Sequence, residues 1–241
     1  MKRSILFVFA HPDDESHWGS GIAVKYHDEG VRTVLVTATR GERGTTGNLC
    51  TADELARVRE EELREAARIL KFDALALLSY VDKELPVAPH EQIRRELVEV
   101  IRRERPPIVV TFDPNGVTLH IDHLAISRFV TDAIAAAADP RWFPELGAPH
   151  EVSRLLWTPS VMPWDEGDFP PRPSVDFLID TATWWPLRRD ALAAHRTQRA
   201  TLDKLYLKSP HCERMLSFDV LRQAWGPRLD RRPASDVFAG L

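Results

Sequence analysis

The chain has 241 residues, of which 44% are hydrophobic, and a formal net charge of −4 at pH 7. A chain of this length buries a sizeable core without disulfide or metal staples, and its size fits a single domain over residues 1–241. Acidic residues interrupt the basic stretches, such as the one at residues 102–105. The pattern therefore indicates a solvated surface and argues against a protein that binds nucleic acid.

The cysteines and the N-terminal residues bear on the compartment. Two cysteines, Cys50 and Cys212, lie far apart in polar surroundings, whereas a secreted disulfide framework needs more of them. We therefore expect a cytoplasmic protein. The apolar run at residues 5–10 is too short to span a bilayer, and no small-residue cleavage site follows it. It is expected to form a buried strand, and no membrane partner is expected.

The first half of the chain alternates apolar runs with amphipathic segments. The runs are short, continuous and partly β-branched, which is typical of buried strands. Strands are predicted over residues 5–10, 31–38, 74–80 and 107–112, and helices over residues 16–29, 52–70, 90–104 and 121–138. This alternation predicts an α/β fold with a Rossmann-like, mostly parallel sheet and helices on both faces.

The second half of the chain is less regular. Strands are predicted over residues 152–158 and 175–179, with a proline-rich loop over residues 159–173 between them. A helix is predicted over residues 185–207. The segment after Ser209 is rich in Pro and Arg, and we expect it to form an irregular C-terminal extension, draped over the surface or partly mobile.

A polar cluster follows the first predicted strand. The residues His11-Pro12-Asp13-Asp14-Glu15 stand where this strand ends and a helix begins. The carboxyl ends of strands form the ligand crevice of open α/β sheets. A His and an Asp three residues apart on such a turn can aim at one point.

A second cluster, with His120, Asp122 and His123, follows the fourth predicted strand. The strand order of such a sheet can bring the two loops together. Two histidines and one carboxylate would supply three protein ligands, the number that catalytic zinc typically takes while it leaves one position for water. Zinc lowers the pKa of that water to roughly 7. A further carboxylate is then available as a general base, and the spare histidine as an acid or an oxyanion stabiliser.

Each cluster alone has a simpler interpretation. An Asp after a strand is usually a helix cap, so Asp13 or Asp14 could cap the first helix and Asp122 the fourth. Two such clusters, each directly after a predicted buried strand, favour the metal site. The first loop also lacks the glycine-rich turn that a dinucleotide site needs.

The pairing of Ala-His-Pro-Asp-Asp-Glu at residues 10–15 with His-x-Asp-His at residues 120–123 resembles the LmbE-like, or PIG-L-type, family of zinc-dependent N-acetylglucosaminyl deacetylases. The resemblance spans about residues 4–205. It implies a hydrolase that removes the acetyl group from a small-molecule N-acetylglucosamine conjugate and releases acetate and a free amine. It implies one Zn²⁺ per chain, although Fe²⁺ can occupy the same kind of site because affinity alone does not select zinc. Relatives often assemble into trimers or hexamers, so the resemblance is compatible with a homo-oligomer.

The resemblance also implies roles for individual residues. The implied metal ligands are His11, Asp14 and His123. Asp13 is implied as the general base that takes a proton from the attacking water. His120 is implied as the residue that stabilises the oxyanion, and Asp122 as its orienting carboxylate. A carboxylate behind an imidazole fixes its tautomer and favours its charged form.

Weaker matches to the family concern Arg59, Asp82 and the segment at residues 194–198. Arg59 corresponds to a family arginine that contacts substrate, and its alternative is a surface residue in an i,i+4 charge pair. Asp82 corresponds to an Asp that binds a sugar hydroxyl, and its alternative is an ordinary turn residue. The segment Ala-His-Arg-Thr-Gln at residues 194–198 resembles a recurrent family motif to which we assign no chemistry.

Three other functions stay open at this point. Two histidines and a carboxylate also fit the triad of non-haem iron oxygenases. A sugar- or metal-binding module without catalysis is a second alternative, and a zinc amidohydrolase that acts on a non-sugar amide is a third. The motifs describe the metal chemistry well but leave the aglycone of the substrate undefined.

Overall fold

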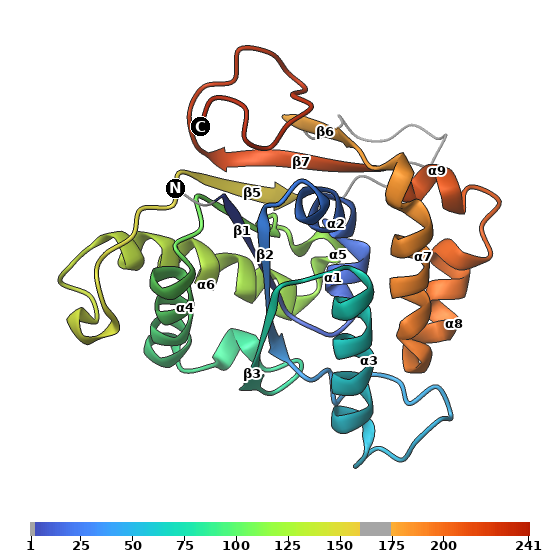
Figure 1. The fold of residues 1–241 in the computed structure, drawn as a ribbon. Helices are drawn as coiled ribbons and strands as arrows, with labels where there is room; N and C mark the ends of the chain where they lie inside the picture. The colour runs from blue at the N-terminus through green and yellow to red at the C-terminus, as the bar shows by residue number, and fades with distance from the viewer. Residues whose placement is uncertain (1–2, 160–174) are drawn as a thin grey trace.

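The computed structural model describes residues 3–159 and 175–241 (Figure 1). The proline-rich loop predicted over residues 159–173 lies outside these residues, apart from Pro159.

A seven-stranded sheet forms the centre of the structure, with the strand order β3-β2-β1-β4-β5-β7-β6. The first five strands run parallel, whereas β7 pairs antiparallel with both β5 and β6. The predicted mostly parallel α/β sheet is therefore confirmed. The strands are β1 (Ser4–Phe9), β2 (Arg32–Thr39), β3 (Ala74–Tyr80), β4 (Ile108–Phe112), β5 (Arg154–Thr158), β6 (Phe177–Asp180) and β7 (Phe218–Trp225).

Helices cover both faces of this sheet (Figure 1). Helices α4 and α6 pack against each other and against β1 on one face, and α2 and α3, with α7 behind them, lie on the other. Every residue of β1 and β4 is buried, because these central strands are covered from both sides. The helices are α1 (Asp14–His17), α2 (Ser20–Asp28), α3 (Leu55–Ile69), α4 (His90–Glu104), α5 (Gly116–Leu119), α6 (Ile121–Ala138), α7 (Trp185–Ala194), α8 (Arg199–Leu202) and α9 (Cys212–Leu216). Short 3₁₀ segments lie at Leu85–Val87, Pro144–Leu146, Ala182–Trp184 and Arg196–Gln198, and Asp203–Leu207 is a π-helix.

Two helices that were predicted as continuous are broken. The segment at residues 16–29 divides into α1 and α2 because Gly19 takes a left-handed conformation, with φ 81°. The segment at residues 185–207 breaks after Ala194, where α7 ends. There the side chain of His195 and the backbone N–H of Thr197 hydrogen-bond to the buried carboxylates of Glu15 and Glu62. These bonds compete with a continuous helix, which the side-chain pattern alone does not reveal.

The C-terminal extension is less irregular than predicted. Part of it, β7, enters the sheet between β5 and β6, which corrects the expectation that the whole segment after Ser209 is draped over the surface. The residues beyond β7 pack onto the sheet edge (Figure 1), where Val237 is fully buried and Arg154 donates hydrogen bonds to the carbonyls of Val237 and Ala239.

Among the described residues, no helix combines the length and the apolar character needed to cross a bilayer. Cys50 and Cys212 are both free thiols.

Candidate metal centre and active site

The candidate residues converge at the carboxyl edge of the parallel strands. The chain leaves β1 toward β2 and β3 on one side and later returns to β4 on the other, so β1 and β4 flank the switch point of the sheet. His11 and Asp14 follow β1, Asp82 follows β3, and His123 lies in the first turn of α6 behind β4. The sequence separation of these residues is large, and the topology alone brings them together.

His11 occupies the centre of the cluster. One ring nitrogen, Nε2, lies 3.0 Å from an oxygen of Asp122 and 3.1 Å from an oxygen of Asp82. A nitrogen that faces two carboxylates carries the proton, so the other nitrogen, Nδ1, presents its lone pair to the opposite side. There Nδ1 lies 3.2 Å from Nε2 of His123.

His123 is oriented in a complementary way. Its Nδ1 lies 3.1 Å from the carbonyl of Gly116 and donates to it, which leaves the lone pair of Nε2 directed at His11. Its ring stacks on Phe112, with 4.0 Å between the ring centroids. Asp14 completes the group, with one oxygen 3.3 Å from Nε2 of His123 and the other 3.5 Å from Nδ1 of His11.

These three side chains fit a zinc ion. Bonds of 2.0–2.1 Å in a tetrahedron place neighbouring ligand atoms about 3.3 Å apart. The two ring nitrogens are 3.2 Å apart, which matches that spacing. Asp14 lies beside both, with one oxygen 3.3 Å from Nε2 of His123 and the other 3.5 Å from Nδ1 of His11. Two imidazole lone pairs and a carboxylate at such distances repel one another unless a cation lies between them.

Other groups of potential ligands lie within the same cluster. His11, His120 and His123 present ring nitrogens within 4.8 Å of one another, and so do ligand atoms of His11, Asp82 and Asp122. The oxygens of Asp82 and Asp122 already accept hydrogen bonds from backbone N–H groups and from His11. They therefore resemble supports for a ligand rather than ligands.

The pKa values of the metal-free cluster reflect this crowding. Burial lowers the pKa of His11, but hydrogen bonds to Asp122, Asp14 and Asp82 outweigh it and raise the pKa well above the usual value. Burial likewise raises the pKa of Asp14, but the neighbouring His123 and His11 hold it well below its ordinary range. The carboxylates thus favour the charged form of His11, and the two histidines favour the charged form of Asp14.

Asp122 and His120 are arranged differently from what the sequence predicted. The carboxylate of Asp122 contacts His11, not His120, and it accepts hydrogen bonds from the backbone N–H groups of Lys83 and Leu85 at 2.6 and 3.1 Å. His120 instead caps α6, and its Nδ1 accepts the backbone N–H of Asp122 at 3.2 Å. Burial and the neighbouring His11 and His123 lower the pKa of His120. His120 is thus a neutral imidazole whose Nε2 carries the proton, rather than a charged one.

Asp13 has an unusual backbone conformation, and its carboxylate is held by Arg59. Its backbone has φ 111° and ψ −29°, outside the conformations that residues with a side chain ordinarily adopt. Strain of this kind costs of order 1–3 kcal/mol and persists where the surroundings impose it. The carboxylate of Asp13 accepts a hydrogen bond from Nη2 of Arg59 at 3.0 Å and makes no cap with α1.

Arg59 is buried, so the alternative of a surface charge pair is wrong for this residue. Its guanidinium also donates to the carbonyls of Pro12 and Gly41. A Cβ at Gly41 would lie 2.0 Å from Nη1 of Arg59, so only glycine allows this approach.

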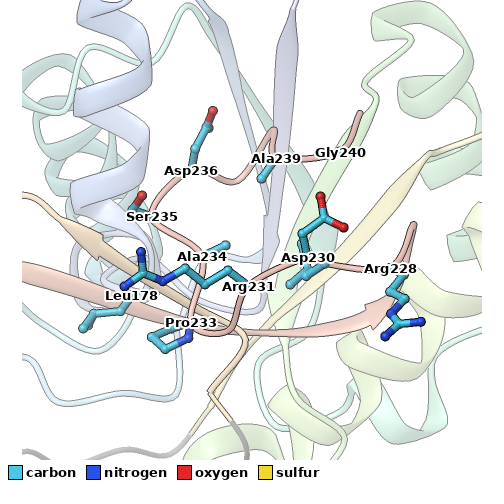
Figure 2. A pocket seen from close by; sticks show the side chains of 11 residues that line it. Leu178, Arg228, Asp230, Arg231, Pro233, Ala234, Ser235, Asp236, Ala239 and Gly240 are labelled. Atoms are coloured by element: carbon cyan, nitrogen blue, oxygen red, sulfur yellow. The ribbon is translucent and has the colours of Figure 1, made fainter.

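A cavity of about 290 Å³ opens beside these groups. The candidate residues that line it are His11, Asp13, Asp14, Arg59, Asp82, His120 and His123, and its other walls include His17, Trp18, Gln198, Thr201, Leu205 and Tyr206. Asp122 is fully buried and does not line the cavity. A larger cavity of about 450 Å³ lies between β6 and the C-terminal segment (Figure 2), but its walls hold no histidine and its two arginines are exposed. The smaller cavity is the one that the candidate residues line.

Comparison with known proteins identifies the family. A family model described as PIG-L, GlcNAc-PI de-N-acetylase, matches residues 6–134, which is more than half of the chain. The chain belongs to the PIG-L family.

Curated relatives of this PIG-L family chain are named as a deacetylase and as an amidase. The 1D-myo-inositol 2-acetamido-2-deoxy-alpha-D-glucopyranoside deacetylase 2 of Saccharopolyspora erythraea is 33% identical over 178 residues, which cover 63% of this chain and 64% of that protein. The mycothiol S-conjugate amidase of Streptomyces coelicolor is 34% identical over 161 residues, which cover 58% of this chain and 55% of that protein. The chain thus spans less than two thirds of the length of either relative.

A solved structure of similar fold is the N,N'-diacetylchitobiose deacetylase from Pyrococcus horikoshii. It has a TM-score of 0.73 and 22% identity, and the match covers 92% of this chain and 83% of that one. At this identity the likeness concerns the fold.

Sequence reasoning missed one part of this PIG-L site, the buried pair Glu15 and His195. Nε2 of His195 lies 2.7 Å from an oxygen of Glu15, directly behind Asp13. The family motif at residues 194–198 contains His195, but no pattern in the sequence shows that His195 lies against Glu15, 180 positions earlier in the chain.

Proposed function

We propose that this protein is a zinc-dependent hydrolase that removes an acetyl group from the nitrogen of an N-acetylglucosamine conjugate. The observation that carries the proposal is the orientation of His11 and His123. Nε2 of His11 faces the carboxylate of Asp122, and Nδ1 of His123 faces the carbonyl of Gly116. The other two ring nitrogens, Nδ1 of His11 and Nε2 of His123, face each other beside Asp14 at the wall of the cavity.

His11, Asp14 and His123 are the residues that would hold the metal. A zinc ion held there lowers the pKa of water to roughly 7 and polarises the acetyl carbonyl. The buried carboxylates of Asp122 and Asp82 fix the tautomer of His11 and raise the basicity of the nitrogen that faces the metal.

Asp13 is the proposed general base. It lines the cavity, and Arg59 holds one of its oxygens at 3.0 Å. Asp13 takes a proton from the attacking water as the new C–O bond forms at the acetyl carbon. It then delivers that proton to the sugar nitrogen as the C–N bond breaks, so the products are acetate and a free amine.

His120 is the proposed oxyanion donor. Because its Nδ1 accepts the N–H of Asp122, the proton resides on Nε2 of a ring that lines the cavity. A neutral N–H donor stabilises the oxygen as negative charge develops on it. The role that the resemblance gave to Asp122 changes, since its carboxylate supports the metal ligand His11 instead.

Asp82 and Arg59 line the same cavity and are proposed to contact substrate there. Asp82 accepts hydrogen bonds from His11 and from the backbone of Arg43, and it retains acceptor capacity for a sugar hydroxyl. Arg59 acts both on substrate and on Asp13.

The test measures acetate release from metal-stripped protein with and without added zinc. The substrates are N-acetylglucosaminyl inositol, N,N'-diacetylchitobiose, an S-conjugate of mycothiol and an N-acetylated amine that has no sugar. Zinc-restored release of acetate from a sugar conjugate supports the proposal, and the His11→Ala variant should then lose both zinc and activity. Zinc-bound protein that releases no acetate from any sugar conjugate would overturn it.

The S-conjugate arm covers a second candidate within the hydrolases. This candidate is cleavage of an amide other than the N-acetyl group, and the relative from Streptomyces coelicolor, which is named as an amidase, favours including it. Amine release without acetate would identify this activity.

A further inference from the structure

The buried pair of Glu15 and His195 has no part in the proposed chemistry. Both side chains are fully buried, and Nε2 of His195 lies 2.7 Å from Oε1 of Glu15. Ser16 donates to the same oxygen at 2.6 Å. Neither Glu15 nor His195 lines the cavity, so neither contacts substrate.

Glu15 nevertheless reaches Asp13. Its second oxygen, Oε2, accepts the backbone N–H of Asp13 at 3.0 Å. This is the residue whose backbone takes φ 111°, an unfavourable conformation for any residue other than glycine. The bond from Glu15 holds the backbone of Asp13, while Arg59 holds its carboxylate. The two contacts together fix where the carboxylate of Asp13 lies in the cavity.

Stability alone does not account for this pair. A buried ion pair often stabilises a fold no better than apolar residues of similar volume, because removing both charges from water is costly. One ring nitrogen of His195, Nδ1, is buried and has no hydrogen-bond partner within residues 3–159 and 175–241. A buried and incompletely satisfied polar group points to a specific local task.

A neighbouring contact offers a natural comparison. Glu62, on α3, is also buried and accepts two hydrogen bonds from Thr197, at 2.9 Å from its backbone and 2.7 Å from its hydroxyl. It anchors the same segment at residues 194–198 that carries His195. No hydrogen bond joins Glu62 to Asp13 among the described residues.

We propose that Glu15 and His195 are positioning residues that hold the general base Asp13 in its strained, productive conformation. His195 fixes the carboxylate of Glu15, and Glu15 fixes the peptide N–H of Asp13. The C-terminal motif thereby acts on the reaction centre through two hydrogen bonds and without touching the substrate. The inference rests on the proposed function, because it presumes that Asp13 is the base.

The test compares Glu15→Met with Glu62→Met. Each variant removes a buried carboxylate and keeps its volume, and both loosen the segment at residues 194–198. We expect both to bind zinc as the wild type does. Glu15→Met should lose much more turnover than Glu62→Met, with kcat lower by roughly 10²-fold and KM unchanged, because a small misplacement of a catalytic group has an effect of that size. Glu62→Met leaves the bond from Glu15 to the N–H of Asp13 in place, so its loss of kcat should be small. Glu15→Gln should restore most of kcat, since its amide oxygen still accepts the N–H of Asp13.

A second variant, His195→Leu, removes the support of Glu15 while Glu15 itself stays in place, and it should lower kcat in the same way. A crystal structure of Glu15→Met supplies a readout that is independent of activity, and Asp13 should have left its positive φ. Equal kcat losses in Glu15→Met and Glu62→Met, or retention of the positive φ with unchanged kcat, would overturn the proposal. Absence of acetate release from the wild-type protein would instead count against the proposed function, and the crystallographic comparison would still decide the positioning.

Discussion

The carboxylate of Asp122 lies 3.0 Å from Nε2 of His11, on the side of the imidazole that faces away from His123. This contact determines which nitrogen of His11 is protonated and therefore which one is available to a metal. An aspartate of the second motif thus acts on the histidine of the first, 111 residues away in the chain.

Replacement of Asp122 by Asn should weaken zinc binding by about 10–100-fold. The two carboxylate oxygens accept bonds from His11 and from the N–H groups of Lys83 and Leu85, so the N–H₂ of an Asn would face a donor in either orientation. Competition with a chelator measures the affinity. Asp132→Asn is the matched control, because Asp132 lies on the same helix, its side chain is half-exposed, and its ion-pair partner is Arg94 rather than a residue of the site. Equal zinc affinity in Asp122→Asn and the wild type would remove the carboxylate from the support of His11.

Replacement of Asp13 by Asn should leave zinc content unchanged and lower kcat by roughly 10²-fold or more, since an amide cannot accept the proton of the attacking water. Metal analysis and steady-state kinetics on the same preparation separate the two effects. Asp53→Asn, at an exposed position, serves as the control. Full activity of Asp13→Asn would exclude Asp13 as the base.

The sequence was sufficient to predict the parallel sheet and the convergence of its two polar clusters. Central strands such as β1 and β4 are nearly continuous apolar runs, so their composition predicts burial on both faces of the sheet. Strand ends in a parallel sheet share one edge, and this places His11 and His123 together without knowledge of any contact.

Contacts across the chain could not be predicted in the same way. Asp122 stands two residues from His120, and the family resemblance implied that pairing, but the helix directs its carboxylate toward His11. The break after Ala194 depends on buried carboxylates contributed by distant segments, and β7 depends on a free edge of β5. Each of these features is decided by tertiary structure and leaves no periodic signal.

The pH dependence of stability should report on Asp82 in the metal-free protein. Burial raises the pKa of its carboxyl, but the hydrogen bond and charge of His11 outweigh it and lower the pKa to about 2. The unfolded value is about 3.9, so the unfolded state binds more protons between these two values. The stabilisation is therefore fully present above about pH 4 and is lost as the pH falls toward 2. In urea unfolding, the free energy of unfolding should fall less between pH 5 and pH 3 for Asp82→Asn than for the wild type. An equal dependence of this free energy on pH in the two proteins would contradict the assignment.

Replacement of Arg59 by Lys should lower kcat about 10-fold or more and spare zinc binding. The planar guanidinium serves Asp13, Pro12 and Gly41 at once, whereas an ammonium is a point charge on a flexible stem. Arg57→Lys, on the exposed face of the same helix, should be silent. Steady-state kinetics measure both variants. Equal activities would mean that a positive charge near Asp13 is sufficient for turnover and that the planar guanidinium is not required.

Removal of the carboxylate of Asp219 should test how β7 is anchored. Asp219 lies 2.7 Å from Nη2 of Arg188 and also accepts the backbone N–H of Ile22 at 2.8 Å, and both charged side chains are buried. Asp219→Ala leaves the guanidinium without its counter-charge, so unfolding in urea should show a loss of about 3–5 kcal/mol. The exposed pair of Arg189 and Asp190 provides the contrast, and Asp190→Ala should cost at most about 1 kcal/mol. Similar losses in the two variants would mean that the ion pair does not anchor the strand, and that β7 is held by its ladder with β5 and β6.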